Sequence, residues 1–271
     1  MLTFKEPTTL QHWAVKQKRK GRRIALVPTM GYLHEGHLSL IRRAKQKCSD
    51  EIVVSIFVNP VQFGPKEDYA KYPRDLAGDL KKCEEAGATA VFVPQPETMY
   101  PKDFSVFVNE EELSKGLCGA KRPGHFKGVC TVITKLFNLI HPNVAVFGQK
   151  DYQQAQIIKR LVRDLNYDIE VVVSPIVRES TGLAKSSRNT YLKHDDLNKA
   201  LAISLGLRMV KRAHISIAQL KKRLVDAGLK VDYVEAVDAK TLKPVKKIKH
   251  GVCVLVAAYA GKTRLIDNVL I

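Results

Sequence analysis

The chain of 271 residues carries 45 basic and 27 acidic side chains, which gives a formal net charge of +18. Hydrophobic residues make up 45% of it and charged residues 27%, a composition that is typical of folded globular proteins and excludes disordered or collagen-like chains. The longest apolar run, residues 252–260, is nine residues long, about half of the roughly 18–20 that a membrane-spanning helix needs. The charge suggests an anionic partner, and nucleic acid, nucleotides and acidic metabolites all fit it; a solvated basic surface is the alternative.

The N-terminus and the cysteines indicate the cellular compartment. Lys5, Glu6 and Pro7 stand where a secretory signal has its apolar segment, so we expect a cytoplasmic protein without membrane association. The cysteines are odd in number and have no Cys-x-x-Cys spacing, which favours reduced, buried thiols over disulfides or a zinc knuckle. They are Cys48, Cys83, Cys118, Cys130 and Cys253.

Up to about residue 177, short Val/Ile-rich runs alternate with amphipathic stretches. The runs predict strands at 24–29, 52–59, 89–94, 144–148 and 170–177. The stretches predict helices at 38–48, 75–86, 128–140 and 152–165. This alternation is typical of an α/β fold with a parallel sheet covered on both faces. Ligands of such sheets bind beyond the carboxyl ends of the strands, so we expect the functional residues directly after the strands.

From about residue 178 the pattern changes to two helices followed by three extended stretches. The helices are predicted at 195–212 and 217–227, and the strands at 231–237, 252–259 and 263–269. Residues 185–271 contain 18 basic and 7 acidic side chains. We therefore expect two domains, an α/β domain at 1–177 and a small, basic α+β domain at 178–271.

The first candidate site follows the first long strand. His34 and His37 are three residues apart, about one helical turn, so both side chains can face one ligand. Gly36 between them lets a ligand approach the backbone, and the start of a helix suits phosphate. The alternative is that both are ordinary surface histidines that bind no ligand. Zinc is disfavoured because the spacing is not that of His-Glu-x-x-His and no third ligand is evident nearby.

The second and third candidate sites follow later strands. Asn59 ends one strand, and the amide of Gln62 can both donate and accept hydrogen bonds, although capping the local backbone is its alternative role. Lys150 follows another strand and suits a phosphate or carboxylate, whereas Asp151 has a possible structural role as a helix cap. Of the adjacent Gln153 and Gln154, only one can point into a site.

The fourth candidate site, Lys185 to Arg188, combines two hydroxyls with two cations. The guanidinium of Arg188 can bind two phosphate oxygens, and Ser186 and Ser187 can donate to the same anion. A mobile loop here could close over a nucleotide, and a solvated basic loop is the alternative. Two further turn segments, 72–75 and 122–126, contain polar residues that could face the same cleft.

Together these segments resemble the pantoate–β-alanine ligase family, within the cytidylyltransferase-like superfamily that includes class I aminoacyl-tRNA synthetases. The matching segments, in order, are MGYLHEGH at 30–37, NPVQF at 59–63, YPR at 72–74, RPGHF at 122–126, KLFN at 135–138, FGQKDYQQ at 147–154 and SSRN at 186–189. The resemblance spans roughly residues 20–195. It implies a Rossmann-like nucleotide-binding domain with a smaller C-terminal α+β domain.

The resemblance also implies a reaction. ATP and pantoate form pantoyl adenylate and pyrophosphate, and the amine of β-alanine then attacks the activated carbonyl to give pantothenate and AMP. Because the pantoate carboxylate is itself the nucleophile, the enzyme mainly positions the reactants and stabilises charge. Mg²⁺ is expected with ATP, with Asp79 as its candidate protein ligand, and a homodimer is implied.

The resemblance assigns roles to individual residues. His37 is implied to donate a proton to the departing pyrophosphate, Gln62 to bridge pantoate and β-alanine beside Asn59, and Gln154 to bind pantoate. The implied catalytic residues are His34, His37, Lys150, Ser186, Ser187 and Arg188. The implied ATP-binding residues are Met30, Gly31, Tyr32, Leu33, His34, Glu35, Gly36, His37, Gly148, Gln149, Lys150, Asp151, Val177, Lys185, Ser186, Ser187 and Arg188.

Two positions depart from the family pattern: Gln149 stands where Glu is usual, and Lys185 where Met or Leu is usual. Two other functions stay open. A nucleotidyltransferase of the same superfamily would share the first and fourth sites but leave Gln62 and Gln154 without a role. A nucleic-acid-binding module is disfavoured, because residues 185–271 offer only three aromatic residues for base stacking.

Overall fold

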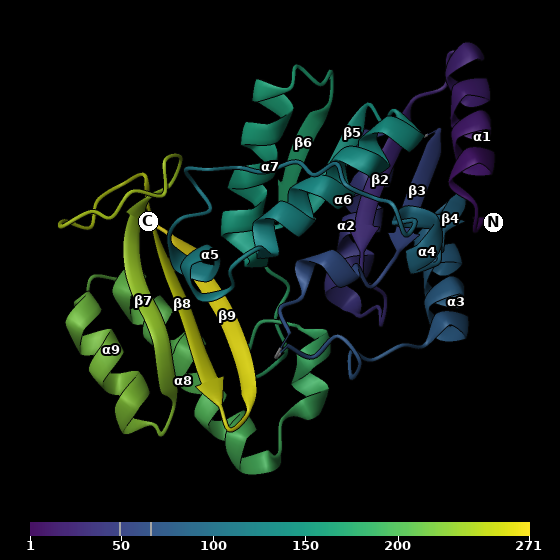
Figure 1. The fold of residues 1–271 in the computed structure, drawn as a ribbon. Coiled ribbons are helices and arrows are strands. Elements are labelled where there is room, and N and C mark those ends of the chain that lie inside the picture. The colour runs from purple at the N-terminus through teal and green to yellow at the C-terminus, as the bar shows by residue number, and fades with distance from the viewer. Residues whose placement is uncertain (49, 66) are drawn as a thin grey trace.

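The computed structural model describes residues 1–48, 50–65 and 67–271, and the chain forms one six-stranded and one three-stranded sheet (Figure 1). The larger sheet is entirely parallel and has the order β1-β4-β3-β2-β5-β6. Its strands are β1 (Leu2–Phe4), β2 (Ile24–Thr29), β3 (Glu51–Ile56), β4 (Ala90–Phe92), β5 (Val144–Gly148) and β6 (Glu170–Ser174). The predicted parallel α/β sheet is therefore confirmed.

Helices cover both faces of this sheet, which explains why its central strands are apolar on both sides. Helices α2 and α3 share one hydrophobic cluster with the sheet, while α1, α6 and α7 share another on the opposite face. The helices of this part are α1 (Pro7–Arg19), α2 (Glu35–Lys47), α3 (Leu76–Ala86), α4 (Pro96–Met99), α5 (Leu117–Lys121), α6 (His125–Ile140) and α7 (Tyr152–Asp164).

The smaller sheet is antiparallel, in the order β7-β8-β9, and confirms the α+β character predicted for the C-terminal part. Its elements are α8 (His194–Lys211), α9 (Ile217–Asp226), β7 (Lys230–Asp238), β8 (Val252–Ala260) and β9 (Thr263–Leu270). Residues alternate along β8: Val254 packs with α8 and α9, whereas Leu255 joins the cluster of the larger part. The small sheet therefore lies between its own helices and the rest of the chain (Figure 1).

Several boundaries differ from the predicted ones, and each has a local cause. Strand β6 ends at Ser174, three residues early, because a proline follows that cannot donate to the sheet. Helix α2 starts at Glu35, since the side chain of His34 caps it. β1 and α1 were not expected, because β1 has three residues and α1 buries only Leu10, Ala14 and Gln17.

The cysteine prediction is confirmed, because all five thiols are buried and unpaired. Across the part of the chain that the structure describes, no helix is long and apolar enough to span a membrane.

Candidate active site

Three loops at the carboxyl ends of β2, β5 and β6 converge around a cavity of about 170 Å³. The predicted site residues that line it are Met30, His34, Gly36, His37, Gly148, Lys150, Asp151, Gln154, Val177, Lys185, Ser186, Ser187 and Arg188. A second cavity of about 440 Å³ shares Lys150, Asp151, Gln154, Ser186 and Arg188 with it and extends toward β8 and β9. The fold thus brings together residues as far apart in the sequence as Met30 and Arg188.

His34 and His37 are fixed by a reciprocal cap at the start of α2. The Nδ1 atom of His34 accepts the backbone N–H of Gly36 at 3.1 Å, and the backbone N–H of His34 donates to Nδ1 of His37 at 3.3 Å. A ring nitrogen that accepts a hydrogen bond carries no proton, so each neutral ring holds its proton on Nε2. Both Nε2–H groups are therefore available to a ligand.

The surroundings keep these histidines neutral. Burial, reinforced by Lys150, Lys185 and Lys82, lowers the pKa of His34 to about 4. Burial and the neighbouring His34 lower the pKa of His37 well below its usual value. At neutral pH both rings are hydrogen-bond donors without charge. Among the described residues there is no group of three His, Cys, Asp or Glu side chains that could hold a metal ion.

Gly36 has a second role besides opening the backbone to a ligand. A Cβ atom at this position would lie 2.8 Å from Cε1 and 2.9 Å from Nδ1 of His34. Such distances are closer than van der Waals contact allows, so a side chain would displace the imidazole. The glycine therefore sets the position of His34.

Gln62 and Asn59 lie directly behind Met30. The amide Nδ2 of Asn59 donates to Oε1 of Gln62 at 3.1 Å, and Nε2 of Gln62 is 3.0 Å from Sδ of Met30. Asn59 also caps the short helix η1 (Pro60–Gln62), since its side chain accepts from the backbone of Val61. Both amides are buried, and neither lines the cavity of about 170 Å³, which Met30 does.

A chain of partly buried polar groups that the sequence did not reveal supports Gln62. The carboxylate of Glu67 binds Arg122 through two hydrogen bonds of 2.6 and 2.7 Å, and Arg122 donates to Nε2 of His125 at 2.9 Å. Nδ1–H of His125 then donates to the backbone oxygen of Gln62 at 2.9 Å. Burial and Arg122 lower the pKa of His125 to about 3, which keeps this ring neutral. The sequence singled out the turn at 122–126, but it did not indicate that Arg122 and His125 would bond to Glu67 and Gln62.

The three cations that line the smaller cavity differ in their pairing. Lys185 binds Glu179 at 2.8 Å, and Arg188 holds both oxygens of Asp68 at 2.8 and 2.9 Å. Within the described residues Lys150 forms no ion pair, and burial lowers its pKa. An unpaired ammonium in a partly closed cavity is a strong attraction for an anion.

Ser186, Ser187 and Tyr72 line the same cavity as these cations. Ser187 donates to the backbone oxygen of Tyr32 at 3.3 Å, which ties the fourth candidate site to the first. Ser186 caps the short helix η3 (Ser187–Tyr191) by accepting from the backbone of Arg188. Tyr72 lines the cavity, and the guanidinium carbon of Arg188 lies 5.5 Å from the centre of its ring.

Only one of the two adjacent glutamines of α7 lines the smaller cavity, as expected. Gln154 lines both cavities. Gln153 is buried and bonds only to backbone, accepting from Cys118 and donating to Leu113 and Gly116. Asp151 lines both cavities as well and makes no side-chain cap to α7, so its structural alternative is wrong.

Asp79, the candidate metal ligand, has a different task in this structure. It is 1% exposed, and its two oxygens accept the backbone N–H groups of Tyr32 and Leu33 at 2.7 and 2.6 Å. Each oxygen therefore holds the turn after β2 through one hydrogen bond. Asp79 is a structural anchor for that turn, and Gly31 is packed against it.

Within the described chain, five of the residues implied to bind ATP do not line the smaller cavity. Glu35 pairs with Arg42 on the exposed side of α2. Gln149, at the start of the short helix η2 (Gln149–Asp151), turns toward Asn268 of β9. The remaining three, in the turn that Asp79 anchors, are Gly31, Tyr32 and Leu33.

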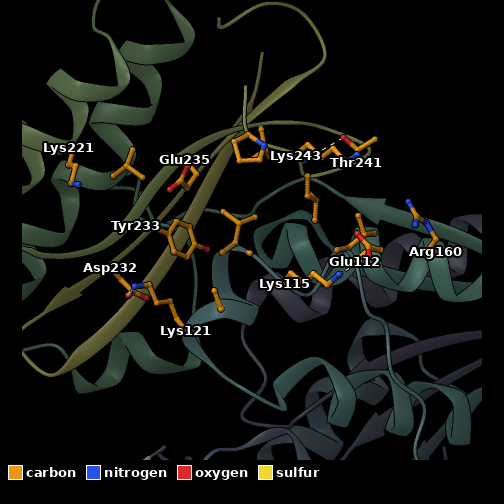
Figure 2. Close-up of a pocket in the computed structure, with 18 residues that line it drawn as sticks. Glu112, Lys115, Lys121, Arg160, Lys221, Asp232, Tyr233, Glu235, Thr241 and Lys243 are labelled. Carbon is orange, nitrogen blue, oxygen red and sulfur yellow. Dashed lines mark hydrogen bonds and ion pairs between the residues drawn. The ribbon is translucent and has the colours of Figure 1, made fainter. Parts of the chain in front are cut away.

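A further cavity of about 660 Å³ lies between α5 and β7 and contains none of the predicted site residues (Figure 2). Charges of both signs surround it, and some neutralise each other, as in the pair of Lys115 with Glu112 at 2.8 Å. Its larger volume does not make it the reaction site, because the convergent donors and the perturbed histidines lie in the other two cavities.

Known proteins of one family resemble this chain over nearly its whole length. The family model "Pantoate-beta-alanine ligase" matches residues 2–270. A curated pantothenate synthetase of Pseudothermotoga lettingae is 53% identical over 94% of both chains, and that of Thermotoga neapolitana is 51% identical over 97% of this chain and 96% of the relative.

Solved structures of the same family share its fold. A crystal structure of pantothenate synthetase from Thermus thermophilus is 41% identical, with a TM-score of 0.91 over 100% of this chain and 99% of that one. The ligase of Francisella tularensis, solved with β-γ ATP and β-alanine, is 34% identical, with a TM-score of 0.86 over 100% and 97%. The chain therefore belongs to the pantoate–β-alanine ligase family.

Proposed function

We propose that this protein condenses pantoate with β-alanine at the expense of ATP, through a pantoyl adenylate, and releases AMP and pyrophosphate. The observation that carries the proposal is the set of neutral imidazole, ammonium, hydroxyl and guanidinium donors around one cavity at the strand ends. Such a set binds a triphosphate and stabilises the charge that develops on it. No side-chain nucleophile is needed, because the pantoate carboxylate attacks the α-phosphorus.

The phosphates are proposed to lie between the two histidines and the loop at residues 185–188. His34 and His37 would donate from Nε2, and Lys150 would supply the charge that no carboxylate of the described chain neutralises. The lowered pKa of His37 favours a hydrogen-bond donor over the proton donor that we expected from the resemblance. Arg188 would exchange its contact with Asp68 for phosphate oxygens.

Pantoate and β-alanine are proposed to bind beside Gln62 and Gln154. The side chain of Gln62 is held by Asn59, and its backbone by His125, so its amide has little rotational freedom to lose on binding. A movement of Met30 would expose this amide to the cavity. Gln154 lines the same cavity from α7.

Mg²⁺ is proposed to arrive with the phosphates of ATP and not to rely on Asp79, whose two oxygens accept backbone hydrogen bonds. Mg²⁺ commonly keeps several waters and binds substrate phosphates with few protein ligands. Asp151 lines both cavities with a carboxylate and is the better candidate for an outer contact.

The remaining proposals concern the assembly and its setting. We place the domain boundary near residue 177 and the protein in the cytoplasm, which its five unpaired cysteines support. A homodimer is supported by an extended apolar segment in which Val106 is 76% and Phe107 39% exposed. Light scattering of Val106→Asp against the unaltered protein tests this: a dimer should become a monomer.

An assay of AMP release, with each substrate omitted in turn, tests the reaction. AMP should form only when ATP, pantoate and β-alanine are all present, and isotope exchange between pyrophosphate and ATP should require pantoate alone. Formation of ADP, or a stable nucleotidyl product without β-alanine, would refute the proposal and favour the nucleotidyltransferase.

A further inference from the structure

We propose that Asp267 and Asn268, adjacent residues of β9, are positioning residues that set the two phosphate-binding loops relative to each other. One loop carries Lys150, and the other runs from Arg178 to Arg188. The inference rests on the proposed function of these loops. Neither Asp267 nor Asn268 was a candidate from the sequence, and both belong to the small sheet.

Asn268 holds the turn that carries Lys150. Its Nδ2 group donates to the backbone oxygens of Gln149 at 2.9 Å and Lys150 at 3.0 Å, so both amide hydrogens are used. Its Oδ1 atom accepts from Nε2 of Gln149 at 3.1 Å. The third bond fixes the orientation of the carboxamide, because a rotated amide would face two carbonyl oxygens with its own oxygen.

Asp267 holds the base of the other loop. Its two oxygens accept hydrogen bonds from the guanidinium of Arg178 at 2.6 and 3.0 Å. The same guanidinium donates to the backbone oxygen of Gly182 at 3.2 Å. Arg178 also pairs through its backbone with Ala184, directly before Lys185. The stem of the loop is therefore fixed three residues before Ser187.

The two attachments are rigidly joined. Oδ1 of Asp267 also accepts the backbone N–H of Asn268 at 2.8 Å. Asp267 is 3% and Asn268 2% exposed, so both are almost completely buried with their polar atoms paired. A displacement of β9 would move both loops together, and the loss of either side chain would free one loop from the other.

The test separates positioning from stability by measuring the two chemical steps apart. Asn268→Asp preserves the shape but puts an oxygen where the two donated hydrogens were. We expect it to slow adenylate formation from ATP and pantoate by tenfold or more, because this step needs the triphosphate aligned with Lys150. The attack of β-alanine on preformed, enzyme-bound pantoyl adenylate should change less than threefold, since the triphosphate is gone by then.

Leu265→Ala is the matched control on the same strand. Leu265 is buried in the cluster of α8 and α9, and the alternation of side chains along β9 puts it on the face opposite Asn268. It should lower the melting temperature and change both steps less than threefold. If Leu265→Ala reproduces the selective loss, or Asn268→Asp slows both steps equally, the positioning role is overturned.

Two further variants keep the test decisive. Should Asn268→Asp fail to fold, Gln149→Ala removes only the bond that orients the carboxamide and should give the same selective loss at about threefold; an unchanged rate of adenylate formation would overturn the inference. In a Lys150→Ala background, Asn268→Asp should add less than twofold, because its effect passes through Lys150. If the unaltered protein forms no pantoyl adenylate, the proposed function is contradicted instead. The same variants would then be compared by their affinity for a non-hydrolysable ATP analogue, measured by titration. An Asn268→Asp protein that binds the analogue as tightly as the unaltered protein would overturn the positioning role.

Discussion

The imidazole rings of His34 and His37 lie against each other, with centroids 4.1 Å apart and planes inclined by 32°. Each ring uses Nδ1 to accept a backbone N–H group at the start of α2, so the Nε2–H groups are left for a ligand. The pair is thus a preformed donor site at a helix N-terminus, where an anion is also favoured by the helix dipole.

His37→Ala removes one of the two imidazole donors. We expect adenylate formation to fall by about 10²–10³-fold, the usual effect of removing one preorganised donor to developing charge. Pyrophosphate exchange measures this step. The exposed His12→Ala is the matched control and should retain the full rate. A His37→Ala protein that still forms adenylate at near-normal rate would remove His37 from the site.

Gly36→Ala places a methyl group against the ring of His34. The overlap should cost about 1–3 kcal/mol of unfolding free energy and turn the ring away from the cavity, so adenylate formation should also fall. Gly116→Ala is the control, because open space surrounds that position and its φ is −101°. Urea unfolding and the exchange assay check both variants. Equal behaviour of the two would show that Gly36 does not constrain His34.

Gln62→Ala tests whether Gln62 binds pantoate and β-alanine. Loss of its amide should raise the KM for pantoate and β-alanine about tenfold, as expected for a lost hydrogen bond of about 1.4 kcal/mol, while the KM for ATP changes less than twofold. Steady-state kinetics with each substrate varied in turn give the three values. The exposed Gln46→Ala should change none of them. A defect confined to ATP would contradict the assignment.

The buried histidines predict how stability depends on pH. His34, with a pKa of about 4, and His125, with a pKa of about 3, stay neutral in the folded protein, whereas the unfolded chain protonates them as pH falls below about 6.5. The unfolded state then binds more protons, so the free energy of unfolding is fully present above pH 6.5 and falls as the pH decreases toward 4.

One histidine should account for a definable part of this slope. His125→Gln should reduce the slope between pH 5 and 6 by up to about 1.4 kcal/mol per pH unit. Urea unfolding at several pH values measures it, with the exposed His12→Gln as control. An unchanged slope would show that His125 is charged in the folded state.

The sequence by itself determined every strand except β1, the long helices except α1, and the loops that line the cavity. Hydrophobic periodicity and turn residues are local signals, so β2 and β5 begin and end where they were predicted. Parallel strands place their carboxyl ends at one edge, which is why residues such as His34, Lys150 and Arg188 could be grouped from their positions along the chain.

Only the tertiary structure decided which polar groups form hydrogen bonds with one another. Asp79 was expected to bind a metal, but the fold brings it to the backbone of the turn after β2. Glu67 with Arg122, and Asn268 with the turn at Gln149, are pairs separated by 55 and 119 residues. The reason is physical: a carboxylate or amide has no preferred partner along the chain, and its partner is whichever polar group the packed sheets and helices bury against it.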